Sequence, residues 1–160
     1  MKRQIRRSVF ETNSSSMHSF TYGNTYNNLV INDEDNCVHT DLGEFGWEIE
    51  TYYDSASKLA YILLAAASVT SHSFWYFGDA SFDEMLESFK ETEEYKRIED
   101  AVKSYMNCNG IVIDEKSEGY IDHQSLEYDT FDNWLDDTGA RSIEDFIFGN
   151  VILHTDNDNH

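Results

Sequence analysis

Two short polar segments of the chain carry residue types that could do chemistry. The first, Glu11 to Ser19, has the sequence ETNSSSMHS and so places a carboxylate, several hydroxyl groups and the imidazole of His18 close together. Hydroxyls and backbone amides in a turn can hold an anion, and Glu11 and His18 could ligate a metal ion or exchange a proton. The alternative is a loop whose Ser, Thr and Asn side chains hydrogen-bond to their own backbone.

The second segment, Gly119 to Ser125, has the sequence GYIDHQS and carries Asp122 and His123 side by side. Adjacent side chains of a strand point to opposite faces of a sheet, so these two cannot pair with each other there. His123 could meet His18 or a carboxylate such as Glu44 or Glu48, in a cluster that suits zinc or another divalent ion. The alternative is a histidine that is hydrogen-bonded in or near the core.

Further groups of candidate residues are less specific. The segment GEFGWE at residues 43–48 adds the carboxylate of Glu48, although its glycines beside aromatic residues favour a structural bend. Cys37 and His39 share one face of a predicted strand and could bind zinc with Cys108, but buried cysteines are common and nothing fixes that pairing. The sequence contains no phosphate-binding glycine loop, no HExxH and no CxxC.

Strands near both ends of the chain would position these residues. Alternating apolar side chains predict strands at residues 4–10, 19–22, 29–31, 37–42 and 151–155, with a further extended piece ending at Tyr52. Residues 110–115 and 119–124 are separated by a short turn, which favours a β-hairpin. These strands predict a mostly antiparallel sheet.

Helices are predicted in the middle of the chain and near its end. The spacing of Leu59, Ile62 and Leu63 predicts a helix that is capped at Asp54 or Ser55 and buried on most faces. Residues 81–105 predict a helix, a break and a second helix capped at Thr92, and two short helices are predicted at 131–137 and from 142. We therefore expect one α+β domain over residues 1–160, with its helices packed on one side of the sheet.

The charge of the chain indicates the kind of partner it meets. It has 11 Lys and Arg against 31 Asp and Glu, a formal net charge of −20. Such a surface repels nucleic acid and anionic lipid, and it attracts proteins with a basic surface. The partner-binding acids are expected on the two middle helices, at Glu84, Glu87, Glu91, Glu93, Glu94, Glu99 and Asp100. No apolar run approaches the roughly 20 residues of a membrane span. With two cysteines, we expect free thiols and a cytoplasmic location.

Four segments together resemble a family of small phage and prophage proteins, mostly without assigned function. They are FETNSSSMHS (10–19), GEFGWE (43–48), GYIDHQS (119–125) and TDNDN (155–159). The resemblance implies a phage origin and a shared polar site at Glu11, His18, Glu44, Asp122 and His123. Small acidic prophage proteins also resemble anti-CRISPR inhibitors of the type II RNA-guided nuclease, at least one of which binds a metal ion.

Two classes of function follow. The first is an inhibitor that binds a type II CRISPR effector nuclease through its acidic surface, as a DNA mimic or by obstruction, and so blocks target DNA. A zinc or other divalent ion would then be structural. The second is a metal-dependent enzyme that acts on a phosphorylated or nucleotide substrate around His18, Asp122 and His123. The negative charge disfavours an anionic substrate unless a cation bridges it, so we expect a binding protein rather than an enzyme.

Overall fold

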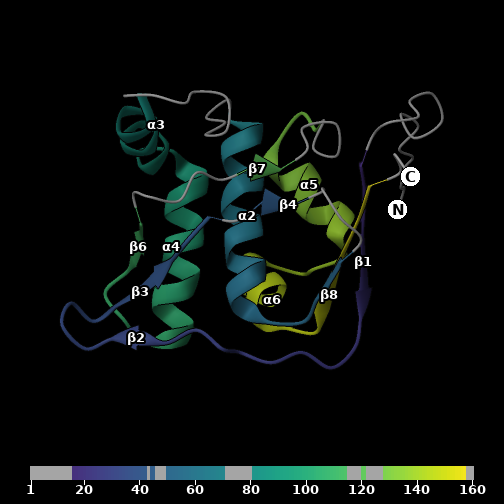
Figure 1. Cartoon of the computed structure of the whole chain (residues 1–160), viewed down its shortest axis with the longest axis horizontal. Coiled ribbons are helices and arrows are strands. Elements are labelled where there is room, and N and C mark those ends of the chain that lie inside the picture. Colours follow the sequence, from purple (N-terminus) through teal and green to yellow (C-terminus); the bar gives the residue numbers. More distant parts are fainter. Residues whose placement is uncertain are drawn as a thin grey trace.

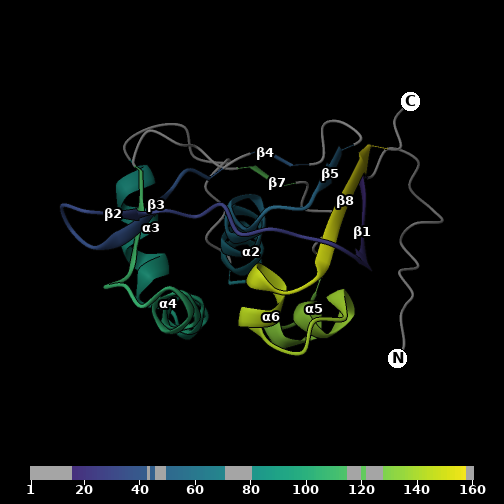
Figure 2. The ribbon, with the colours of Figure 1, turned by 90° about the horizontal axis from the view of Figure 1, so that it is seen from below.

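The computed structural model describes residues 16–42, 44–45, 50–70, 81–114, 120–121 and 128–157. The strands are β1 (Ser16–Tyr22), β2 (Ile31–Asn32), β3 (Cys37–Thr40), β4 (Glu44–Phe45), β5 (Glu50–Tyr52), β6 (Ile111–Ile113), β7 (Tyr120–Ile121) and β8 (Val151–Asn157). The helices are α2 (Ser55–Val69), α3 (Ser81–Lys90), α4 (Glu93–Met106), α5 (Phe131–Thr138) and α6 (Ile143–Phe148). The fold is α+β, as predicted, and Figure 2 shows α4, α5 and α6 on the side of α2 that faces away from the strands.

Helix α2 lies at the centre of the fold (Figure 1) because nearly every face of it is apolar. The predicted cap is confirmed: the Asp54 carboxylate accepts a hydrogen bond from the Ser57 amide at 2.9 Å. Every residue from Lys58 to Ala67 is buried, and the helix packs against α4, α5 and α6. None of the helices within the described ranges is long and apolar enough to cross a membrane.

The sheet beside α2 has the strand order β1-β8-β5, and both pairings are antiparallel. Leu153 of the central strand is fully buried and stands between Phe20 and Tyr52 in register. The Phe20 ring makes edge contacts with three other rings of the core, those of Tyr61, Trp134 and Phe146. This aromatic cluster joins the sheet to α2, α5 and α6.

Two smaller sheets pair segments that are far apart in the sequence. One has the order β2-β3-β6, with β3 and β6 parallel, and the other pairs β4 with β7 in parallel. The predicted hairpin over 110–124 is therefore wrong in the part that the structure describes, since β6 and β7 belong to different sheets. Ile111 and Ile113 are buried where β6 pairs with β3. These side chains are therefore buried by pairing with a strand far away in the sequence, and not by a hairpin with the next strand.

Side-chain caps set the ends of the remaining helices. The predicted break before Thr92 is confirmed, and the Thr92 hydroxyl accepts from the Tyr95 amide at 3.1 Å. Helix α5 ends at Gly139, whose φ of 85° is favoured by glycine. The Tyr22 hydroxyl donates to the carbonyl of Gly139, which ties the end of β1 to the end of α5. The last helix is predicted to start at Ser142, and Ser142 is the N-cap of α6, where its hydroxyl accepts from the Asp145 amide at 3.0 Å.

Candidate functional site

His18 packs against the core. Of the predicted polar site at Glu11, His18, Glu44, Asp122 and His123, it is the one residue whose side chain the structure describes. Its Nδ1 lies 2.5 Å from the hydroxyl of Tyr61, a fully buried residue of α2. The two rings are tilted against each other with centroids 5.5 Å apart. His18 is half-buried on β1, two residues before Phe20, and so belongs to the face of the strand that meets α2. Because the phenol already occupies Nδ1, any ligand role of His18 falls to Nε2.

The other predicted ligands are only partly covered by the structure. Glu11, Asp122 and His123 lie outside the described residues, and Glu44 is described in its backbone alone. The pairing of β4 with β7 sets Glu44 opposite Tyr120. This pairing places Glu44 and Phe45 beside Tyr120 and Ile121, and the position of His123 lies outside the described residues. Within the ranges that the structure covers, no group of three or more His, Cys, Asp or Glu could hold a metal ion. The zinc or divalent-metal site stays a prediction.

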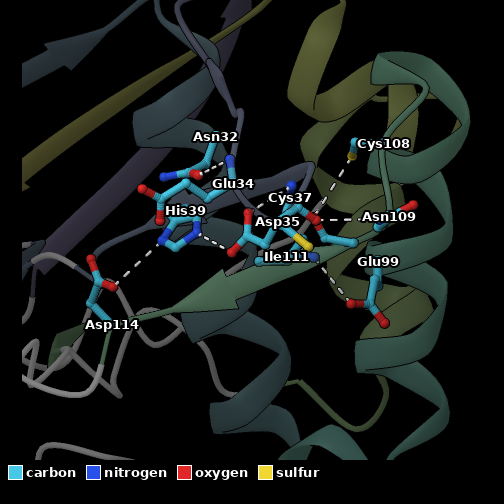
Figure 3. A network of polar contacts seen from close by, with 11 residues as sticks. Asn32, Glu34, Asp35, Cys37, His39, Glu99, Cys108, Asn109, Ile111 and Asp114 are labelled. Atoms are coloured by element: carbon cyan, nitrogen blue, oxygen red, sulfur yellow. Dashed lines mark hydrogen bonds and ion pairs between the residues drawn. The ribbon is translucent and has the colours of Figure 1, made fainter.

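The second candidate zinc group, Cys37 with His39 and Cys108, is directed to different partners (Figure 3). The Nε2 of His39 lies 2.7 Å from Asp35, and its Nδ1 lies 3.9 Å from Asp114. The thiol of Cys108 is buried and approaches the backbone carbonyls of Val102 and Gly110 at 3.9 and 3.7 Å. The imidazole therefore lies between two carboxylates, while the Cys108 thiol contacts backbone carbonyls at the end of α4.

The turn between β2 and β3 orients the His39 ring but does not activate a nucleophile. The hydrogen bond from His39 holds the pKa of the Asp35 carboxyl below its usual range. The same carboxylate accepts from the Cys37 amide at 3.0 Å, which fixes the start of β3. Burial raises the pKa of the Cys37 thiol, and the negative charges of Asp35 and Glu99 add to that rise. A thiol held in its protonated form is a poor nucleophile.

The acids of the predicted partner-binding surface differ in exposure, and one of them, Glu99, is hydrogen-bonded within the fold. Five of the seven predicted acids are exposed, and Glu94 and Glu99 are half-buried. The exposed ones are Glu84, Glu87, Glu91, Glu93 and Asp100. Glu99 accepts the backbone N–H of Ile111 at 3.1 Å and so joins α4 to β6. Burial raises the pKa of Tyr95, and the charge of Glu99 beside it adds to that effect. Glu99 therefore has a structural role, which the charge pattern alone did not reveal.

A buried lysine is the most unusual charged group that the sequence analysis missed. Lys58 is 0% exposed, and its amine donates to the carbonyls of Gly149 and Val151 at 3.1 and 2.9 Å. Burial lowers its pKa to about 8, although Asp54 and Asp145 partly oppose that shift. The signal in the sequence is its position, one residue before the apolar run that begins at Leu59. No protein-family model matches this chain, and no curated protein or solved structure matches it either.

Proposed function

We propose that this protein is an acidic inhibitor that binds a partner's basic nucleic-acid-binding surface and thereby blocks DNA loading. A type II CRISPR effector nuclease is the partner to test first. The exposed carboxylates of α3 and of the start of α4 make the contact, and no chemical step is required. Such an inhibitor competes for the Lys and Arg side chains that otherwise hold nucleic-acid phosphates.

The observation that supports this proposal is the concentration of acids where α3 meets α4. Residues 83–94 contain six acidic side chains and one lysine, Lys90, which pairs with Glu87 at 3.7 Å. Farther along α4, the cations Lys96, Arg97 and Lys103 interrupt the acidic surface. The charge is therefore concentrated over one connection between helices, which favours a defined contact area over general repulsion.

Helix stability accounts for only part of this cluster. Glu93 and Glu94 lie in the first turn of α4, where a negative charge interacts favourably with the helix dipole. Glu84, Glu87 and Glu91 are exposed, and Glu91 lies in the break between the helices. Excess charge on a chain at −20 opposes compaction, so these three carboxylates are better explained by a partner.

A charge-matched pair of variants tests the proposal. The triple variant Glu84→Gln, Glu87→Gln, Glu91→Gln removes three charges from the cluster. Its control, Asp33→Asn, Glu34→Gln, Asp41→Asn, removes three charges from exposed residues of another region. Binding to the guide-loaded nuclease is measured by interferometry at rising salt, and DNA loading by gel shift.

The two triple variants separate a defined surface from net charge. We expect the cluster variant to weaken binding at least about tenfold at low salt, because several charge pairs of roughly 0.5 kcal/mol each are lost. The control variant should change binding less than about twofold, since it leaves those pairs intact. Equal losses in both variants would reduce the proposal to nonspecific attraction, and no binding by the wild type would reject this partner.

A further inference from the structure

Five large hydrophobic side chains are exposed in the part of the chain that the structure describes. They are Tyr22, Tyr26, Val30, Tyr53 and Tyr105. Three of them belong to residues 22–30, which run from β1 to β2 across one end of the fold (Figure 1). The backbone N–H of Tyr26 donates to the carbonyl of Tyr53 at 3.1 Å. The side-chain amide of Asn27 donates to the sulfur of Met106, next to Tyr105, at 3.3 Å. Tyr26, Tyr53 and Tyr105 therefore belong to one neighbourhood.

A cavity of about 480 Å³ opens beside this segment, between the end of α4 and α6. Tyr105 and Phe148 form an aromatic wall, stacked with centroids 3.9 Å apart and planes 12° apart. Gly149 also lines the cavity, and its carbonyl accepts from the Thr25 hydroxyl at 2.7 Å, so Thr25 of the 22–30 segment is bonded to a residue of the cavity wall. Tyr105 is 50% exposed, which leaves part of its ring accessible beyond the stack.

The rim of the cavity carries two carboxylates and one guanidinium. Asp145 accepts from the Arg141 amide at 3.0 Å and is held in place at the start of α6, whereas Glu144 is exposed. The Arg141 side chain is 89% exposed, and its Nε lies 3.8 Å from Asp145. An aromatic face next to carboxylates is the environment that a guanidinium group prefers, because it stacks on the ring and bonds to the acids at its edge.

The same combination already binds an arginine inside this protein. The guanidinium of Arg97 lies 5.6 Å from the centre of the Phe131 ring and bonds to Asp132 at 2.9 Å. That arginine belongs to the fold and joins α4 to α5. At the cavity, the ring of Tyr105 and the carboxylate of Glu144 offer the same two contacts to a group from outside.

We infer that this neighbourhood is a protein-docking surface, with the cavity taking an arginine side chain of the partner and the exposed tyrosines packing around it. The inference rests on the proposed function in one respect, that the partner is basic. A second copy of this chain is disfavoured because two molecules at −20 repel each other, and nucleic acid is disfavoured because its phosphates would face carboxylates. The segment YGNTYNNLV is rich in Tyr, Asn and Gly, the residues that antibody loops use to bind proteins.

The test uses a small probe, so it does not depend on the partner. Acetyl-Gly-Arg-Gly-amide is titrated into the 15N-labelled protein and followed by the amide signals of residues 105 and 148–149. Its control is the same peptide with citrulline, which has the shape of arginine without the charge. We expect saturable shifts at these residues and at least about tenfold weaker binding of the citrulline peptide, since the charge-assisted bonds are lost.

Three variants should change the affinity for the arginine peptide, two by weakening it and one by strengthening it. Tyr105→Leu keeps an apolar residue on the exposed side of α4 and should weaken arginine binding about fivefold by removing the cation–π contact. Glu144→Gln should weaken it about threefold by removing an attractive charge. Arg141→Gln should strengthen it about twofold, because a like charge leaves the rim. A structural role of Arg141 alone would not produce that increase.

The peptide titration can reject the docking site without rejecting the proposed function, and the nuclease experiment can do the reverse. Equal binding of the two peptides, shifts spread over α3 and α4, or no effect of Tyr105→Leu and Glu144→Gln would overturn the docking site. The substitutions at Glu84, Glu87 and Glu91 should leave peptide binding unchanged while they weaken binding to the nuclease. If the nuclease does not bind but the arginine peptide does, the proposed partner fails and the docking site stands.

Discussion

Lys58 and His39 are basic side chains in two regions of the molecule, and they differ in what surrounds them. Lys58 is 0% exposed at the junction of α2, α6 and β8, where it donates to two backbone carbonyls. His39 and Asp35 form a hydrogen-bonded pair at the β2–β3 turn, and their side chains are 34% and 42% exposed. Water competes for the exposed pair and not for the buried amine, so removing the buried amine is expected to cost far more stability, because two buried carbonyls lose their donor. At this junction a lysine is held by backbone carbonyls rather than by carboxylates, although the chain carries a net charge of −20.

The chemistry of the amine fits its position in either protonation state. A neutral amine keeps two N–H groups, which match the two carbonyl acceptors of Gly149 and Val151. Deprotonation therefore preserves both hydrogen bonds and removes the desolvation penalty of the charge. Within this junction Ser55 also donates to the carbonyl of Ile147 at 2.9 Å, so α2 holds the end of α6 through two side chains.

The largest effect is expected from Lys58→Ala. This substitution leaves a cavity and removes the donor from two buried carbonyls, so the free energy of unfolding should fall by roughly 3 kcal/mol. Chemical denaturation at pH 7 measures the loss. The control is Lys96→Ala on the exposed side of α4, which should change stability by less than about 0.5 kcal/mol. Similar effects of the two substitutions would show that burial does not distinguish the two lysines.

Stability should also depend on pH through Lys58. The lysine has a pKa of about 8 in the folded protein and 10.5 in the unfolded chain. Between these values the unfolded chain binds more protons, so the Lys58 contribution to stability rises with pH, by up to roughly 1 kcal/mol per pH unit. Below pH 8 the amine is charged in both states and this contribution is constant.

The pH effect is isolated by comparison with Lys58→Met, which has a similar volume and no charge. Burial raises the pKa values of Tyr95 and Cys37, so both groups ionise first in the unfolded chain and lower stability at high pH. These contributions are common to both proteins and cancel in the difference. The stability of wild type minus that of Lys58→Met should increase from pH 8 to pH 10 in denaturation experiments. A constant difference would mean that the lysine has the same pKa in both states.

Local signals in the sequence predicted the helices well, but contacts between residues far apart in the chain could not be predicted from it. The caps at Asp54 and Thr92, the helix end at Gly139 and the helix start at Ser142 depend on neighbouring residues only, and all of them are confirmed. The hairpin prediction failed because β6 pairs with β3, more than 70 positions earlier in the chain, and no periodicity records such a pairing.

The candidate sites show the same limit. The acidic cluster is visible in the sequence because its members follow each other along two helices. The role of Glu99 is not visible, since it depends on where the backbone of Ile111 comes to lie. The Tyr105 cavity needs α4 and α6 to meet, and the burial of Lys58 needs carbonyls that lie 91 and 93 positions away.

A smaller effect is expected at the histidine that packs on the core. Tyr61→Phe removes the hydroxyl that contacts Nδ1 of His18 at 2.5 Å and changes little else in the packing. The free energy of unfolding should fall by about 1 kcal/mol, the usual contribution of one partly buried hydrogen bond. Tyr105→Phe is the matched control at an exposed position and should have no measurable effect on stability. If Tyr61→Phe is also neutral, the hydrogen bond between Tyr61 and His18 does not stabilise the fold.

The smallest effect is expected from Asp35→Asn at the β2–β3 turn. The amide oxygen of Asn can still accept the Cys37 N–H, so only the interaction of the second carboxylate oxygen with His39 is lost. Because the pair lowers the pKa of Asp35, its stabilising effect is present above the unfolded value of 3.8 and disappears as pH falls through the lower folded value. Wild type and variant should therefore differ slightly at pH 6 and converge as the pH falls below 3.8, as denaturation midpoints would show. A loss at pH 6 as large as that of Lys58→Ala would overturn the comparison, because an exposed pair would then stabilise the fold as much as a buried amine.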